Sequence, residues 1–117
     1  MKTDNIVREK SFSFALKIVD LYKYLHDENK EFVLSKQLLR SGTSIGANVE
    51  ESQAAQSKKD FLSKMSIAAK EARESHYWLR LLKHCDYVSK DDLLQDCEEL
   101  IKLLTSIVKT SGESNFP

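Results

Sequence analysis

Apolar residues recur every three or four positions along almost the whole chain, and few residues interrupt the pattern. The 117 residues include three glycines and one proline. This scarcity removes the turn residues that an all-β fold needs. A spacing of three and four instead places apolar side chains on one face of an α-helix. The sequence therefore predicts an all-α protein.

Four periodic segments, separated by three short polar breaks, predict four helices over about residues 4–26, 35–55, 57–84 and 89–111. Short connections join antiparallel neighbours, so we expect an antiparallel up-down-up-down four-helix bundle over residues 1–111 and a frayed tail over 112–117. Side-chain oxygens at helix starts accept orphan backbone N–H groups. The expected caps are Thr3 or Asp4, Ser35, Ser57 with Asp60, and Ser89 with Asp92.

Each predicted helix has an inward stripe, and the third has a second stripe beside the first. The four inward stripes are Val7, Phe14, Ile18, Leu21 and Leu25; Leu38, Gly42, Ile45, Val49 and Ser52; Phe61, Met65, Ala68, Ala72, Ser75 and Leu79; and Leu93, Cys97, Leu100, Leu104 and Ile107. The second stripe of the third helix is Ile67, Glu71, Glu74, Trp78 and Leu81.

Gly42 and Gly46 lie inside the second predicted helix, where each glycine costs about 1 kcal/mol relative to alanine. Close approach of a neighbouring backbone is the compensation we expect. A glycine-rich phosphate loop is the less favoured alternative, because no strand precedes the segment and no Gly-Lys-Ser/Thr follows it.

Composition excludes several classes of protein. Lys and Arg balance Asp and Glu at 18 each, so no global field attracts nucleic acid or anionic membrane. The first ten residues contain no apolar run, and no apolar stretch is long enough to span a bilayer. We therefore expect a cytoplasmic protein without membrane contact, in which Cys85 and Cys97 stay reduced.

Catalytic and metal-binding patterns are missing from the sequence. A di-iron bundle needs Glu-x-x-His on two helices, but Lys23, Arg73 and Leu81 stand three residues before the three histidines. No local motif sets a nucleophile beside a base and an orienting carboxylate. We expect no cofactor, no metal and no enzymatic activity, unless residues meet across subunits.

Polar residues on the second and third predicted helices form a candidate assembly set. Asn48 is a poor helix former placed within a helix, which favours a polar network that joins it and Glu51 to a neighbouring helix or subunit and specifies register. A solvated face is the alternative, and a ligand pocket is less favoured than either. The candidate assembly set is Arg40, Ser44, Asn48, Glu51, Glu74 and Trp78.

Charge is distributed unevenly along the chain. Residues 58–84 carry seven Lys or Arg and three Asp or Glu. Residues 85–110 carry three Lys or Arg and six Asp or Glu. On the third predicted helix, cations and one aromatic follow helical spacing, and they define the basic stripe. This stripe is suited to contact a phosphate backbone and stack a base. The alternative, which we favour, is that it pairs with the acidic fourth helix of the same bundle or of a neighbouring copy. The basic stripe is Lys59, Lys70, Arg73, Tyr77 and Arg80.

Two motifs resemble a known family. The second predicted helix reads Arg-Ser-x-x-Ser-Ile-x-x-Asn-x-x-Glu, and the third reads Phe-Leu-x-x-x-x-Ile-Ala before a stretch with Glu and Leu. Both resemble the four-helix-bundle proteins encoded in intervening sequences of bacterial 23S rRNA genes. The matching residues are Arg40, Ser41, Ser44, Ile45, Asn48 and Glu51, then Phe61, Leu62, Ile67, Ala68, Glu71 and Leu79, within about 6–109.

The resemblance implies a homopentamer around a central channel. A related branch, the accessory proteins of diversity-generating retroelements, works with reverse transcriptase and nucleic acid. We therefore expect a non-enzymatic assembly or adaptor protein whose ring is a platform for macromolecules, including protein partners. The alternative is a protein that binds structured RNA or DNA through the basic stripe.

Overall fold

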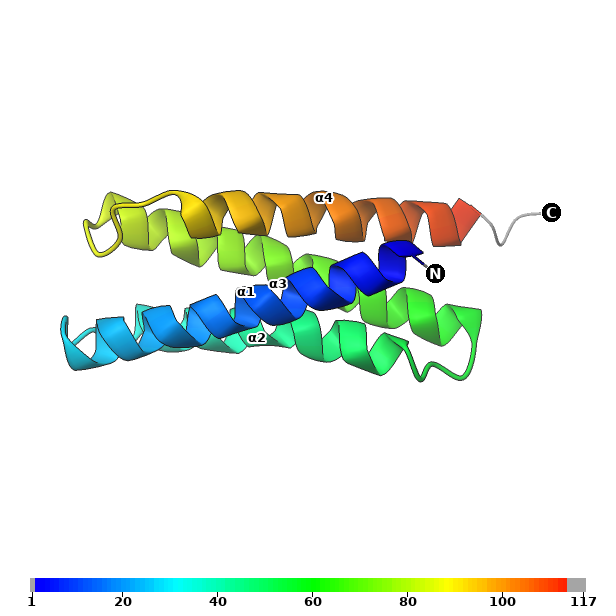
Figure 1. The fold of residues 1–117 in the computed structure, drawn as a ribbon, viewed down its shortest axis with the longest axis horizontal. Coiled ribbons are helices and arrows are strands. Elements are labelled where there is room, and N and C mark those ends of the chain that lie inside the picture. Colours follow the sequence, from blue (N-terminus) through cyan, green and yellow to red (C-terminus); the bar gives the residue numbers. More distant parts are fainter. Residues whose placement is uncertain (1, 114–117) are drawn as a thin grey trace.

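The computed structural model of the chain describes the backbone of residues 2–113 and the side chains of residues 5–112. It contains helices α1 (Lys2–Asp27), α2 (Leu34–Ser52), α3 (Lys58–His84) and α4 (Asp92–Glu113). Figure 1 shows consecutive helices running in opposite directions along a rod of 53 × 22 × 21 Å. Contacts join α1 to α2, α2 to α3, α3 to α4 and α4 to α1. The predicted antiparallel four-helix bundle is confirmed.

The predicted inward stripes form the core. Every member of the α2 stripe is buried, and so are most members of the other three. Leu21, Phe61 and Leu93 are partly buried and pack against the core from its edges. On the second α3 stripe, Glu71 is buried and Ile67 is exposed.

Gly42 and Gly46 lie where α2 meets α1. A Cβ atom added to Gly42 would lie 2.9 Å from both γ carbons of Ile18, and one on Gly46 would lie 3.4 Å from the carbonyl oxygen of Ser11. A close approach is found at Gly42, but the neighbour is the side chain of Ile18 and not the predicted backbone; the backbone that does lie near α2, at Gly46, is at an ordinary contact distance. Both glycines lie in a continuous helix, so the alternative of a phosphate loop is wrong.

The start of α2 differs from the prediction. Ser35 lies in the first turn, where its hydroxyl donates to the carbonyl oxygen of Glu31 at 2.8 Å. The carboxylate of Glu31 binds the helix start instead: it accepts the N–H groups of Val33, Leu34 and Ser35 at 2.9, 3.0 and 2.6 Å. The prediction of Ser35 as the cap is therefore wrong, because a longer side chain from the preceding turn already occupies the orphan donors.

Burial and hydrogen bonding act oppositely on Glu31, whose residue is 8% exposed. Burial alone raises its pKa, but the hydrogen bonds from Ser35, Val33 and Leu34 outweigh burial and hold the pKa below its ordinary value of 4.5. The carboxylate is consequently charged at neutral pH, and it faces the positive end of the α2 dipole.

The start of α3 confirms one predicted cap, and the start of α4 corrects another. Ser57 Oγ accepts the N–H of Asp60 at 3.0 Å, as predicted, but the Asp60 carboxylate accepts the N–H of Gln56 at 3.4 Å rather than that of Ser57. The capping box predicted at Ser89 is wrong, because α4 begins only at Asp92.

The outer ends of α1 and α4 also extend beyond the prediction. Because α1 begins at Lys2, Thr3 and Asp4 lie inside it, with side chains outside the described residues. Gly112 keeps a helical backbone without positive φ, so α4 continues to Glu113 instead of ending at Ser111 and Gly112. The rest of the predicted tail, 114–117, lies outside the described residues.

Candidate assembly face and basic stripe

An ion-pair network joins α2 to α3. The guanidinium of Arg40 donates to Glu71 Oε2 at 2.8 Å and also to Glu74, and the indole N–H of Trp78 donates to Glu74 at 3.0 Å. Glu71 is buried, while the side chain of Arg40 remains 49% exposed. Three members of the candidate assembly set thus meet within one chain, and Glu71 completes the group.

Hydrogen bonds fix the charges in this network. The bond from Trp78, followed by that from Arg40, holds the pKa of Glu74 below its ordinary value, and the charge of Lys70 lowers it further. The bonds to Glu74 and Glu71 raise the pKa of Arg40. Arg40 and Glu74 therefore keep their charges at neutral pH, and the ion pairs set the register of α2 against α3.

The remaining members of the candidate assembly set lie along α2. The Ser44 hydroxyl donates to the carbonyl oxygen of Arg40 at 2.6 Å, and the Asn48 amide donates to that of Ser44 at 2.9 Å. Both bonds stay within the helix, so the predicted link from Asn48 to a neighbouring helix is wrong within the chain. Glu51 does reach α3, where it pairs with Lys64 at 3.2 Å.

An apolar face that the sequence analysis missed lies on the other side of α2. Phe12 and Leu16 of α1 are 62% and 55% exposed. Phe12 borders a groove of about 270 Å³ between α1 and α2, whose lining includes Thr43 and Ala47 of α2. We call Phe12, Leu16, Thr43 and Ala47 the apolar face. Its signal was present in the sequence: Phe12 and Leu16 are four residues apart, both are apolar, and neither belongs to the inward stripe of α1.

The basic stripe lies on the outer side of α3. Tyr77 is 49% exposed, and the guanidinium of Arg73 donates to the Thr105 hydroxyl of α4 at 3.3 Å. Within the described residues, no carboxylate lies at ion-pair distance from any of its four cations. The structure thus brings the members of the stripe together on one exposed surface: Lys59, Lys70, Arg73, Tyr77 and Arg80.

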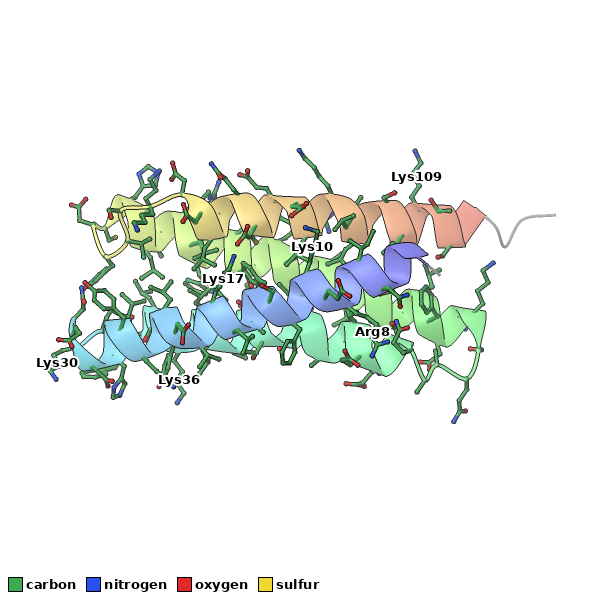
Figure 2. The ribbon with its side chains drawn as sticks, viewed as in Figure 1. Arg8, Lys10, Lys17, Lys30, Lys36 and Lys109 are labelled. Atoms are coloured by element: carbon green, nitrogen blue, oxygen red, sulfur yellow. The ribbon has the colours of Figure 1, made fainter. Side chains whose placement is uncertain are left out.

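The acidic residues of α4 mainly pair with α1. Lys17 reaches Asp96 at 2.8 Å and Lys10 reaches Glu99 at 3.1 Å; Figure 2 shows both lysines extending from α1 toward α4. The hydrogen bond and charge of Asp96 raise the pKa of Lys17. On the α3 side, Glu98 pairs with His76 at 3.0 Å, and His76 is not in the stripe. The favoured prediction is therefore wrong for the fourth helix of the same chain, within the described residues; pairing with the fourth helix of a neighbouring copy stays a prediction.

Other reactive groups are buried or dispersed. Burial, followed by the charges of Glu98 and Asp96, raises the pKa of the Cys97 thiol to about 12, while Cys85 is exposed. Among residues 5–112, no cluster of three or more His, Cys, Asp or Glu is arranged to hold a metal ion. No helix in the described range has both the length and the apolar character needed to cross a membrane.

The fold and these motifs agree with the comparisons. The sequence model of the 23S rRNA-intervening sequence protein family matches residues 3–106, and the chain belongs to this family. It is similar to a protein of unknown function from the S23 ribosomal protein family of Bacteroides thetaiotaomicron VPI-5482. The two chains are 53% identical, with a TM-score of 0.89 over 92% of this chain and 98% of the other. No curated protein matches the chain.

Proposed function

We propose that this protein is a non-enzymatic assembly or adaptor protein that forms a homopentameric ring in the cytoplasm and serves as a platform for macromolecular partners. The observation that supports it is the apolar face, on which Phe12 and Leu16 are more than half exposed. Exposed apolar side chains that gather beside a groove are typical of interaction surfaces.

In a closed ring, one patch on each chain packs against a different patch on the next chain. The bundle offers two such patches, because it exposes apolar residues on both sides of α2. The apolar face is one patch. The other lies on α3, where Ile67 is 39% exposed and Trp78 is partly buried. Between them, Ser44 and Asn48 of the candidate assembly set present small polar groups on α2. In this arrangement, Phe12 and Leu16 of one copy pack against the α2–α3 surface of the next.

Light scattering on a size-exclusion column tests the ring. We expect a mass five times the 13.4 kDa of the chain. Phe12→Glu with Leu16→Glu should yield the single-chain mass with an unchanged helical circular dichroism spectrum, because the new carboxylates would be buried without partners. Ser106→Glu, which adds a carboxylate on an exposed position of α4, should remain pentameric. A wild-type protein of single-chain mass at micromolar concentration would overturn the proposal.

A second candidate function, binding of structured RNA or DNA, is favoured by one observation. Asp96 and Glu99 of α4 pair with α1, which leaves the cations of the basic stripe without carboxylate partners in the described part of the chain. A ring would repeat the stripe in every copy, and linked weak contacts add by avidity.

Fluorescence anisotropy with labelled RNA hairpins and duplex DNA tests this candidate. We expect binding that weakens steeply with salt, because phosphate contacts release counterions. Combined Lys70→Glu, Arg73→Glu and Arg80→Glu should abolish binding but leave the oligomer intact. The matched control combines Lys23→Glu, Lys36→Glu and Lys90→Glu at exposed positions elsewhere. Absence of wild-type binding at low salt, or equal losses in both triple variants, would argue against it.

A further inference from the structure

A groove of about 240 Å³ lies between α3 and α4, beside the basic stripe. None of its lining residues is acidic, and two are cationic. Ala69 and Val108 give it an apolar floor suited to a sugar, while hydroxyls and cations surround that floor. The lining residues are Ser66, Ala69, Arg73, Thr105, Val108 and Lys109.

The polar groups of this groove are suited to an anion. Arg73 donates to the Thr105 oxygen at 3.3 Å, which orients the guanidinium and leaves the hydroxyl hydrogen of Thr105 available to donate. Lys109 extends from α4 into solvent (Figure 2), and no carboxylate in the described residues pairs with it. Guanidinium, ammonium and hydroxyl groups together match the acceptor oxygens of a phosphate group.

Tyr77 lies on the same face of α3, one turn beyond Arg73. Four residues of helix correspond to about 6 Å along the axis. The Tyr77 ring is 49% exposed and packs edge-on against Trp78, with ring centroids 5.0 Å apart and an interplanar angle of 72°. Trp78 is itself bonded to Glu74, so the Tyr77 ring packs against an anchored neighbour while about half of the residue stays exposed to solvent.

We propose that the groove and Tyr77 form a single site for one unpaired nucleotide of a nucleic-acid strand. Arg73 and Lys109 hold its phosphate, the Thr105 hydroxyl donates to a phosphate oxygen, and the base stacks on Tyr77. A base inside a duplex already has stacked neighbours, so the site selects single-stranded segments over paired ones. This inference rests on the second candidate function and adds the form of nucleic acid that is bound.

Anisotropy with a short labelled oligouridine strand, free or paired with its complement, tests the site on the wild-type oligomer. The free strand should bind more tightly than the duplex. Tyr77→Leu should weaken its binding about tenfold, whereas Tyr77→Phe, which keeps a stacking ring, should not. Arg73→Gln and Lys109→Gln should each weaken binding and lower the salt slope by about 0.7, whereas Lys90→Gln, the matched control in the α3–α4 connection, should do neither.

The outcomes separate this inference from the function on which it rests. If the stripe variants abolish salt-dependent binding while Tyr77→Leu and Lys109→Gln bind like the wild type, the basic stripe binds nucleic acid but the nucleotide site is wrong. Equal affinity for free and paired strands would also overturn the site. If the wild type binds neither RNA nor DNA, the second candidate function fails and the site fails with it. Circular dichroism melts of each variant identify any loss that is due to unfolding.

Discussion

A missing methyl group at residue 42 lets α1 and α2 approach closely at Ile18. Gly42→Ala would place a Cβ atom 2.9 Å from both γ carbons of Ile18. Overpacking of this kind costs about 1–3 kcal/mol, against a gain of about 1 kcal/mol in helix propensity. We therefore expect a lower free energy of unfolding, measured by urea denaturation.

Gly46→Ala is the matched comparison, because its Cβ atom would meet the Ser11 backbone at 3.4 Å, which is an ordinary contact. The gain in propensity of about 1 kcal/mol should then dominate, and this variant should be at least as stable as the wild type. Equal free energies of unfolding for the two alanine variants would contradict this interpretation of the α1–α2 contact.

At the residue scale, cap motifs were only partly predictable from spacing, because Ser57 caps α3 whereas Ser89, with the same spacing to Asp92, does not cap α4. Ser57 was recognised as a cap because its partner, Asp60, is three residues away. Glu31 was missed because a carboxylate that caps from the preceding turn has no fixed spacing motif. Phe12 was missed because the search for one inward stripe gives no role to apolar residues outside it.

At the scale of elements, the start of α2 depends on the charge of Glu31. Its pKa in the folded protein is lowered from 4.5, so its contribution to stability is present above that value and is lost as the pH falls through the folded pKa. Glu31→Gln should lower the free energy of unfolding at neutral pH by about 1–2 kcal/mol, a typical loss for a cap.

Thermal melts at neutral and acidic pH measure this effect. The difference in melting temperature between wild type and Glu31→Gln should shrink as the pH falls, because protonation removes the charge that the variant already lacks. Glu28→Gln, at an exposed position in the same connection, is the control and should melt like the wild type at each pH. A constant difference across the range would show that the charge of Glu31 is not responsible.

The pairing of elements was predictable from helix number and loop length, but their register was not. Arg40 and Glu71 are 31 residues apart, and no periodicity within α2 or α3 indicates which turns face each other. The structure supplies this alignment, and it shows why Arg40, Glu74 and Trp78 come together while Asn48 bonds to its own helix.

At the scale of the whole molecule, self-assembly would link stability to concentration. If copies associate through the apolar face, the folded ring gains stability by mass action. The melting temperature of the wild type should rise with protein concentration, while that of Phe12→Glu should not. Differential scanning calorimetry over a hundredfold range of protein concentration measures this shift. Association stabilises the folded state by about 2.7 kcal/mol when the concentration is about one hundred times the dissociation constant. A wild-type melting temperature that is independent of concentration would count against assembly.

The overall architecture was the most predictable level, because scarce glycine and proline and four amphipathic segments allow few other folds. The distribution of charge between helices was not predictable. Consecutive basic and acidic helices predict pairing of α3 with α4. In the structure, Lys10 and Lys17 of α1 instead form ion pairs with Glu99 and Asp96, because α1 also contacts α4 in the bundle.

The contact between Gly42 and Ile18 has a consequence for how the sequence can diverge. Both γ carbons that block a Cβ at residue 42 belong to the β-branch of Ile18, so a change to valine, which keeps both atoms, would not open the position. A substitution that removes the branch at residue 18 would have to come before any substitution of Gly42. Homologues with a side chain at position 42 should therefore carry an unbranched residue at position 18, whereas position 46 should be either glycine or alanine.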